Sequence, residues 1–227
     1  MPGFYAALWN NRRMSKRVNF LLALLVVTSA TLAGWWLSQS SRPEAPQLTH
    51  GTLIEPARVL ADFELVDAAG GRFGSADLKG GWHLLFFGFA SCPDVCPFTL
   101  ATLHEASLAL DDLPTAKRPR VVMVSVDPER DDPARLTAYV SHFDPDFLGV
   151  SGTREQLDRL TGDLGVPVLI GAPDQGGYYS VDHGAALFLI DPRGQLRAIL
   201  SAPHEPAGIA DSVRAVVAFT TTMDDPA

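Results

Sequence analysis

Basic residues are scarce in most of this 227-residue chain, and their scarcity excludes one class of partner. Four of the 18 Lys and Arg residues precede position 18, so 14 basic residues stand against 26 acidic ones after position 40, a net charge of −12. No basic stripe interrupts this balance, and a surface of that sign repels nucleic acid and anionic lipid. We therefore expect no nucleic-acid partner. Internal repeats and low-complexity tracts are absent too, and 47% hydrophobic residues indicate a globular chain.

Charge of either sign is missing from residues 18–41, and the first forty residues contain no acidic side chain. The most apolar part, residues 20–37, is about long enough to cross ~30 Å of hydrocarbon as a helix that rises ~1.5 Å per residue. We therefore predict a transmembrane anchor at residues 18–37. The alternative is a cleaved signal peptide, because Thr31-Leu32-Ala33 offers a weak cleavage site. The apolar run is, however, longer than the core of a signal peptide, which favours the anchor.

The residues on either side of this anchor predict its orientation and the organisation of the chain after it. Trp35 and Trp36 close it, and basic residues precede it in a predicted cytoplasmic segment, residues 1–17, as the positive-inside and aromatic-belt tendencies describe. Residues 38–52 are rich in Ser, Pro, Gln and Thr and indicate a juxtamembrane linker. Residues 53–227 then form one domain in a compartment where disulfides persist. The basic residues ahead of the anchor are Arg12, Arg13, Lys16 and Arg17.

Strand and helix patterns alternate through this domain. Apolar and β-branched runs predict strands at residues 63–66, 83–89, 121–126, 186–190 and 195–200. Helical spacing of apolar residues predicts helices that begin at Pro97 and near Pro133, a short helix over residues 157–164 that stops at Gly165, and a last helix around residues 209–217. Strands interleaved with helices, followed by a hairpin and a helix, predict an α/β three-layer domain.

The chain has only two cysteines, and they lie close together in Cys92-Pro93-Asp94-Val95-Cys96-Pro97. Two thiols at this spacing share one helical face, with Cβ atoms about 5–6 Å apart, so they can close a disulfide or hold a soft metal ion. The usual redox motif has one residue fewer between its cysteines, and buried cysteine as a plain hydrophobe is the remaining alternative. A strand-to-helix junction is expected to lower a thiol pKa, which serves disulfide exchange and metal binding alike.

A histidine could complete a metal site, and one of the six stands out. His183 directly precedes the predicted strand at residues 186–190, and in a thioredoxin-like sheet the loop into that strand faces the cysteine turn. Asp182 is expected either to orient His183 or to cap its own loop. Asp127 and Asp131 are expected to be turn and helix-capping residues. The other histidines are His50, His83, His104, His142 and His204.

Three motifs, in this order along the chain, resemble those of the SCO/SenC family. The resemblance covers about residues 55–220, and it includes the N-terminal anchor. The resemblance implies a thioredoxin-like fold behind a transmembrane helix, and the family's copper ligands fall on Cys92, Cys96 and His183. The two cysteines would also be its redox pair. Gly184 stands where the family often has serine. The motifs are Phe87-Gly88-Phe89-Ala90-Ser91-Cys92-Pro93-Asp94-Val95-Cys96-Pro97, Val124-Ser125-Val126-Asp127-Pro128-Glu129-Arg130-Asp131 and Val181-Asp182-His183.

Family members are membrane-anchored copper chaperones, so the resemblance implies delivery of one copper ion to the binuclear copper site of cytochrome c oxidase subunit II. It also implies a periplasmic copper donor, a thiol reductant and a bacterial inner membrane, preferred over the mitochondrial one. Two thiolates and an imidazole suit Cu(I) and tolerate Cu(II), whereas structural zinc sites use four protein ligands. A thiol-disulfide oxidoreductase that keeps target cysteines reduced is the alternative function, and a copper or redox sensor a weaker one.

Overall fold

The computed structural model describes residues 16–40, 44–67, 69–172, 174 and 179–224, which belong to two compact units. The units are Met1–Glu44 and Ala45–Ala227. Most of the predicted cytoplasmic segment, including Arg12 and Arg13, lies outside the described residues.

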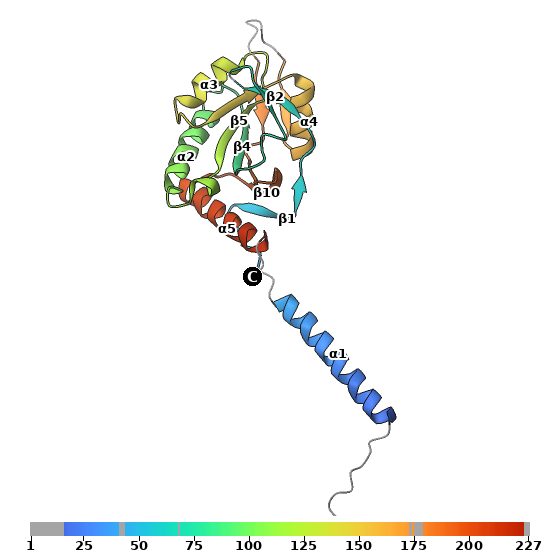
Figure 1. Ribbon diagram of the computed structural model, residues 1–227. Helices are drawn as coiled ribbons and strands as arrows, with labels where there is room; N and C mark the ends of the chain where they lie inside the picture. The colour runs from blue at the N-terminus through green and yellow to red at the C-terminus, as the bar shows by residue number, and fades with distance from the viewer. Residues whose placement is uncertain (1–15, 41–43, 68, 173, 175–178, 225–227) are drawn as a thin grey trace, which may run out of the picture. The chain divides into compact units, whose positions relative to one another are not determined.

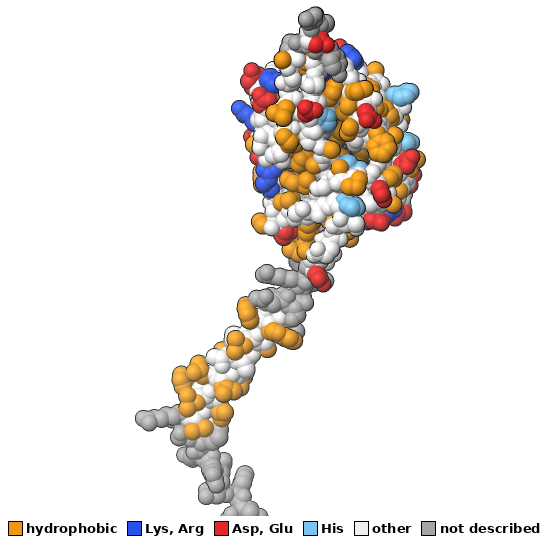
Figure 2. Space-filling view, turned by 180° about the vertical axis from the view of Figure 1, so that it is seen from behind, with side chains coloured by type: hydrophobic (Ala, Val, Ile, Leu, Met, Phe, Trp, Pro, Cys, Tyr) orange, Lys and Arg blue, Asp and Glu red, His pale blue; other side chains and the backbone are white. Residues whose placement is uncertain are grey.

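The first unit contributes helix α1 (Lys16–Ser40) to the described residues. Its stretch Val18–Trp36 is long and apolar enough to cross a membrane, judged by length and composition alone. Hydrophobic side chains cover its surface (Figure 2), and none of this stretch is buried within the described residues. The helix spans the predicted anchor, residues 18–37, which stays a prediction.

Eight strands of the described residues form one mixed sheet in the second unit (Figure 1). Their order across the sheet is β1-β10-β9-β4-β5-β6-β2-β3. The central strands β4, β5 and β6 run parallel, and their outer neighbours pair antiparallel. The strands are β1 (Gly51–Val59), β2 (Glu64–Asp67), β3 (Arg72–Gly74), β4 (His83–Gly88), β5 (Arg120–Ser125), β6 (Leu148–Ser151), β9 (Leu187–Ile190) and β10 (Gln195–Leu200).

Two further strands, β7 (Val168–Ile170) and β8 (Val181–His183), pair only with each other in a separate antiparallel ribbon, as far as the described residues show. Helices cover both faces of the large sheet, and one 3-10 turn, η1 (Thr115–Lys117), precedes β5. The helices of this unit are α2 (Val95–Ala109), α3 (Pro133–Ser141), α4 (Arg154–Leu164) and α5 (Pro206–Asp224).

Strand β4 divides the hydrophobic core into two halves. Leu84 and Phe86 pack with residues of α2, α3 and α5, whereas Leu85 and Phe87 pack with residues of α4 and of the loops on the opposite face. A strand covered on both faces has no position that favours a polar residue, which explains its uninterrupted apolar run. The predicted α/β three-layer arrangement is confirmed.

Several predicted elements recur with small shifts at their ends. The predicted strands at residues 83–89, 121–126, 186–190 and 195–200 are confirmed as β4, β5, β9 and β10. The short helix α4 ends where predicted, because Gly165 adopts φ 70°, a left-handed conformation that stops the helix. The sequence pattern predicts none of the strands β1, β3, β6, β7 and β8. Strand β1 begins at Gly51, within the stretch predicted as linker.

Helix α2 begins two residues earlier than the predicted start at Pro97, and the difference changes the cysteine geometry. Pro97 is the third residue of the helix, a position where the missing amide hydrogen costs nothing because the first four helical N–H groups have no partner within the helix. Cys96 is therefore helical, whereas Cys92 lies in the loop before the helix. The expectation that both thiols share one helical face is wrong.

Leu85→Ala should lower the free energy of unfolding by about 2–5 kcal/mol, because it removes a side chain that has no exposed surface at the centre of the sheet. Leu108→Ala, at an exposed position of α2, should change it by less than about 0.5 kcal/mol. Urea unfolding of the domain Ala45–Ala227, followed by circular dichroism, measures both changes. Equal losses in the two variants would contradict this account of the core.

Candidate metal centre

The topology brings the cysteine loop and His183 to the same end of the sheet. The cysteine loop leaves β4 after Gly88, and three residues separate His183, the last residue of β8, from the start of β9. Strands β4 and β9 are antiparallel neighbours, with Phe86 opposite Leu187. The end of β4 therefore lies beside the start of β9, and segments about 90 residues apart in sequence meet there.

Cys96 and His183 are in contact. The Cys96 Sγ atom lies 3.7 Å from Nε2 of His183, and Nδ1 of the same ring lies 3.2 Å from the Gly184 carbonyl oxygen. A hydrogen on Nδ1 that is donated to this carbonyl leaves the Nε2 lone pair directed at the sulfur. The Phe89 ring meets the imidazole edge to face, with centroids 5.9 Å apart. The ring is thus held with its free nitrogen toward Cys96.

The Cys96 thiol is kept neutral by burial. Its residue is 1% exposed, and burial raises the pKa of the thiol to about 12, with a further increase from the Cys92 thiol next to it. The expectation that the strand-to-helix junction lowers the thiol pKa is wrong for Cys96, since loss of hydration outweighs the helix dipole here. Burial likewise lowers the pKa of His183, so its imidazole is neutral at pH 7.

Cys92 differs from Cys96 in its surroundings. It is half-buried and its thiol is free, as is that of Cys96. Its amide hydrogen-bonds the Phe89 carbonyl at 3.2 Å, which closes the turn that carries it. Within the described residues no three His, Cys, Asp or Glu side chains are already arranged around one metal position. Cys96 and His183 are thus in contact, and Cys92 lies in the turn that precedes them along the chain.

Gly88 gives the Cys96 sulfur its space. A Cβ atom at this last position of β4 would lie 2.9 Å from Cys96 Sγ and 3.0 Å from the Met123 methyl carbon. Both neighbours belong to buried residues, so a side chain at this position would push against the Cys96 sulfur.

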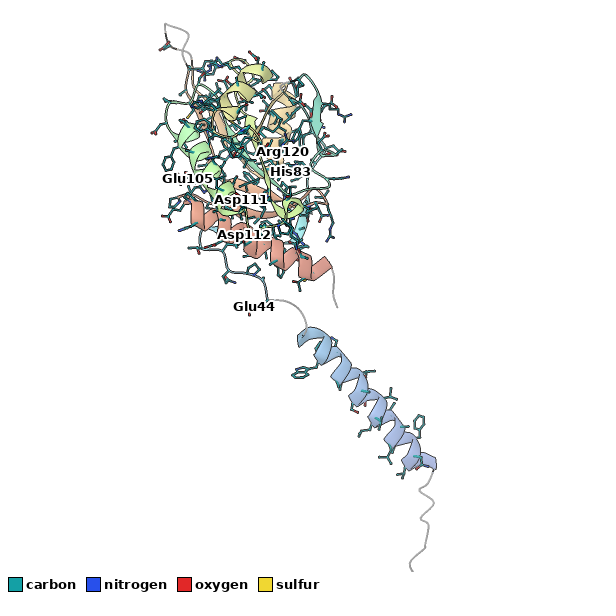
Figure 3. All side chains as sticks on the ribbon, turned by 60° about the vertical axis from the view of Figure 1, so that its left-hand side comes forward. Glu44, His83, Glu105, Asp111, Asp112 and Arg120 are labelled. Carbon is teal, nitrogen blue, oxygen red and sulfur yellow. The ribbon has the colours of Figure 1, made fainter. Side chains whose placement is uncertain are left out.

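The other described histidines lie apart from the cysteines. His83 is at the opposite end of β4, beside Arg120 (Figure 3), and is buried. The His104 Nδ1 atom lies 2.9 Å from an Asp144 carboxylate oxygen. His204 lies in a loop, but its Nε2 atom is 2.6 Å from the Ala185 carbonyl oxygen, in the segment that joins His183 to β9.

Among the acidic residues near the centre, Asp131 departs from its expected role. Asp131 does not cap a helix: it is 1% exposed, and its Oδ2 atom accepts hydrogen bonds from the Ala90 amide and the Ser125 hydroxyl, both at 2.8 Å. Asp132 instead caps α3. Asp127 is also fully buried, and the apolar strand that precedes both aspartates was the available signal. Asp182 is exposed, and the group that orients His183 is the Gly184 carbonyl.

These features define a class: a thioredoxin-like domain with a reduced cysteine pair and a neutral histidine at one end of its sheet. The SCO1/SenC family model matches residues 51–218, so the chain belongs to this family. A Stutzerimonas stutzeri protein that is named as copper-binding is 39% identical over 69% of this chain and 76% of its own length. The mitochondrial SCO2 homologue of Bos taurus is 34% identical over 87% of this chain and 74% of its own.

Solved structures agree with this assignment. The copper-bound ScoI of Bradyrhizobium japonicum is 32% identical, with a TM-score of 0.61 over 69% of this chain and 98% of that one. The copper-bound ScoI of Arabidopsis thaliana is 28% identical, with a TM-score of 0.64 over 70% and 98% of the two chains. The thioredoxin-like fold that the family resemblance implied is confirmed.

Alkylation of the reduced, metal-free protein should modify Cys92 at least about tenfold faster than Cys96, because the thiolate is the nucleophile and the Cys96 thiol is both buried and protonated. Iodoacetamide labelling near pH 8 followed by peptide mass spectrometry measures both rates. Unfolding in urea, as the control, should make the two rates similar. Equal rates in the folded protein would contradict the described burial.

Proposed function

We propose that this protein is a membrane-anchored copper chaperone that holds one copper ion between Cys92, Cys96 and His183. The observation that carries the proposal is the 3.7 Å contact between Cys96 Sγ and His183 Nε2, with the other ring nitrogen tied to a backbone carbonyl. A thiol hydrogen and a soft cation compete for the same place between these two atoms, because binding requires a deprotonated sulfur. Cys92, in the adjoining turn, is the third donor.

Copper fits this donor set better than zinc. Two thiolates and an imidazole form a soft set of low coordination number that suits Cu(I) and tolerates Cu(II). Structural zinc uses four protein ligands. The copper-bound structures of two relatives support the same choice. A three-ligand site also leaves one coordination position free, through which an acceptor's thiolate or imidazole can take the ion by exchange.

The proposed destination is the binuclear copper site of cytochrome c oxidase subunit II, and its support is the family resemblance. The apolar stretch Val18–Trp36 supports the proposed anchor. Basic residues ahead of it support an orientation in a bacterial inner membrane with the domain in the periplasm. There the domain would receive copper from a periplasmic donor and electrons from a thiol reductant.

A second function, thiol-disulfide oxidoreductase, is favoured by one specific observation. Cys92 is half-buried whereas Cys96 is 1% exposed. This asymmetry suits exchange, in which the Cys92 thiolate attacks a partner disulfide and Cys96 then displaces the partner by closing the Cys92–Cys96 disulfide. The partner leaves with both cysteines reduced, and this chain leaves oxidised. Both functions need the same reduced pair.

Cu(I) competition titration of the reduced protein should give one ion per chain. His183→Ala should weaken binding by more than about 100-fold, since loss of groups that only orient a ligand already costs about 10–100-fold. His142→Ala, a surface control, should bind as the parent does, and Cys92→Ser with Cys96→Ser should not bind. Normal copper affinity in His183→Ala would overturn the ligand assignment, and weak binding by the parent would favour the oxidoreductase.

The copper affinity should rise with pH by at least about tenfold per unit between about pH 6 and 9. The pKa of the Cys96 thiol, about 12, means that this thiol carries its proton over the whole range and must release it to bind a cation. Titration against a chelator of known pH dependence measures the slope. An affinity independent of pH would exclude Cys96 as a ligand.

A further inference from the structure

The loop after β5 lies between the two segments that carry the candidate ligands. Its turn is closed by hydrogen bonds from the Arg130 and Asp131 amides to the Asp127 carbonyl, at 3.2 and 3.0 Å. Its first residue, Val126, donates its amide to the Gly88 carbonyl at 2.9 Å. The loop is therefore attached to the end of β4, where the cysteine turn begins.

On one side this loop holds the residues just before Cys92. The buried Asp131 carboxylate accepts the Ala90 amide hydrogen at 2.8 Å. From the first turn of α3, Arg135 donates to the Ser91 hydroxyl at 2.9 Å. The backbone leading into Cys92 is thus fixed by side chains from outside its own turn.

On the other side the loop holds the residue that leads into β8. The Arg130 guanidinium lies 3.9 Å from the centroid of the Tyr179 ring and donates to the Tyr179 carbonyl at 3.2 Å. The Tyr179 hydroxyl donates to Asp127 Oδ1 at 2.6 Å, and Arg130 also pairs with the Asp127 carboxylate. A stacking contact and two hydrogen bonds therefore converge on Tyr179, two positions before the strand that ends in His183. An ion pair joins the two residues, Arg130 and Asp127, that make these contacts.

Arg130 also reaches the imidazole through one aromatic ring. Its guanidinium lies 5.5 Å from the centroid of Phe89, and Phe89 is the ring that meets His183 edge to face at 5.9 Å. Contacts thus run from His183 through Phe89 and Arg130 to Tyr179, and from there back along the chain to His183. The ribbon β7–β8 pairs with no other strand among the described residues, so side chains must hold it in place.

We propose that Arg130 and Tyr179 are positioning residues that clasp the β7–β8 ribbon against the cysteine turn and so hold Nε2 of His183 beside Cys96. Tyr179 acts on the ribbon, and Arg130 joins the ribbon to Phe89 in the cysteine turn. Loosening the clasp should release the imidazole while the cysteine pair stays in place, because the pair is held separately through Asp131 and α2. The copper part of the inference rests on the proposed function, whereas the closure of the ribbon over Cys96 does not.

Four variants of the full-length protein in detergent micelles test the clasp. Tyr179→Leu removes the ring and the hydroxyl, and Tyr179→Phe keeps the ring over Arg130. Arg130→Lys keeps the charge but loses the planar stacking group. Arg214→Lys is the matched control: Arg214 also pairs with an aspartate, Asp112, and donates to a backbone carbonyl. Asp112 lies beyond the end of α2 (Figure 3), about 20 Å along that helix from Cys96.

The first readout is the electron spin-echo modulation from an imidazole nitrogen in the Cu(II)-loaded protein, beside Cu(I) affinity. Tyr179→Leu and Arg130→Lys should show a weaker nitrogen modulation than the parent and bind Cu(I) about 10–100-fold more weakly, as loss of a ligand-orienting contact does. Tyr179→Phe should lie closer to the parent, and Arg214→Lys should match it. A merely destabilising effect would leave the modulation unchanged in the folded fraction.

The second readout needs no metal: the alkylation rate of Cys96 in the reduced protein. A loosened ribbon uncovers Cys96, so Tyr179→Leu should react at least about tenfold faster than the parent and Arg214→Lys at the parental rate. If the parent protein binds no copper, the proposed function is wrong. The alkylation rate of Cys96 then tests by itself whether Arg130 and Tyr179 hold the ribbon over Cys96. Parental modulation and parental alkylation in Tyr179→Leu and Arg130→Lys, or equal changes in Arg214→Lys, would overturn the proposed clasp.

Discussion

The complete burial of β4 is the constraint on which the rest of the domain depends. A strand covered on both faces leaves none of its backbone amides and carbonyls to water, so each must pair with β5 or β9. That requirement fixes the register on both sides, with Phe86 between Met123 and Leu187. The register then decides where the chain leaves the sheet: the cysteine turn departs from one end of β4, and the segment after His183 joins β9 beside it.

The same burial determines the charge state of the centre. A neutral thiol and a neutral imidazole lose little hydration energy in an enclosed place, whereas a thiolate there needs a cation beside it. Cys96 and His183 therefore meet as uncharged groups, and the arrangement would become ionic only with a bound cation, as proposed. An uncharged pair also avoids an unpaired charge in the core, which would destabilise the fold.

The sequence predicted those features that depend on local pattern. The strand at residues 83–89 was recognisable because its burial on both faces leaves one apolar run, and α4 because its leucines recur at helical spacing before Gly165. Strands β1 and β6 were not recognisable, since partners distant in sequence, β10 and β2, stabilise them. Strand β3 pairs with its neighbour β2 and, at three residues, is too short to show an alternating pattern. The start of α2, the burial of Asp131 and the pKa of Cys96 depend on tertiary contacts, which a motif does not encode. The ligand set came from family resemblance, and the structure places two of its members in contact.

The isolated β7–β8 ribbon gives the two halves of the centre different local stabilities. A two-stranded ribbon is marginal by itself, and its amides open to solvent exchange through small local fluctuations, whereas those of β4 exchange only when the whole sheet opens. The cysteine turn thus leaves a strand that is expected to exchange slowly, and His183 ends a ribbon that is expected to exchange faster. An ion bound as proposed would join the two, so that its occupancy would change the exchange protection of β7 and β8 far more than that of the sheet.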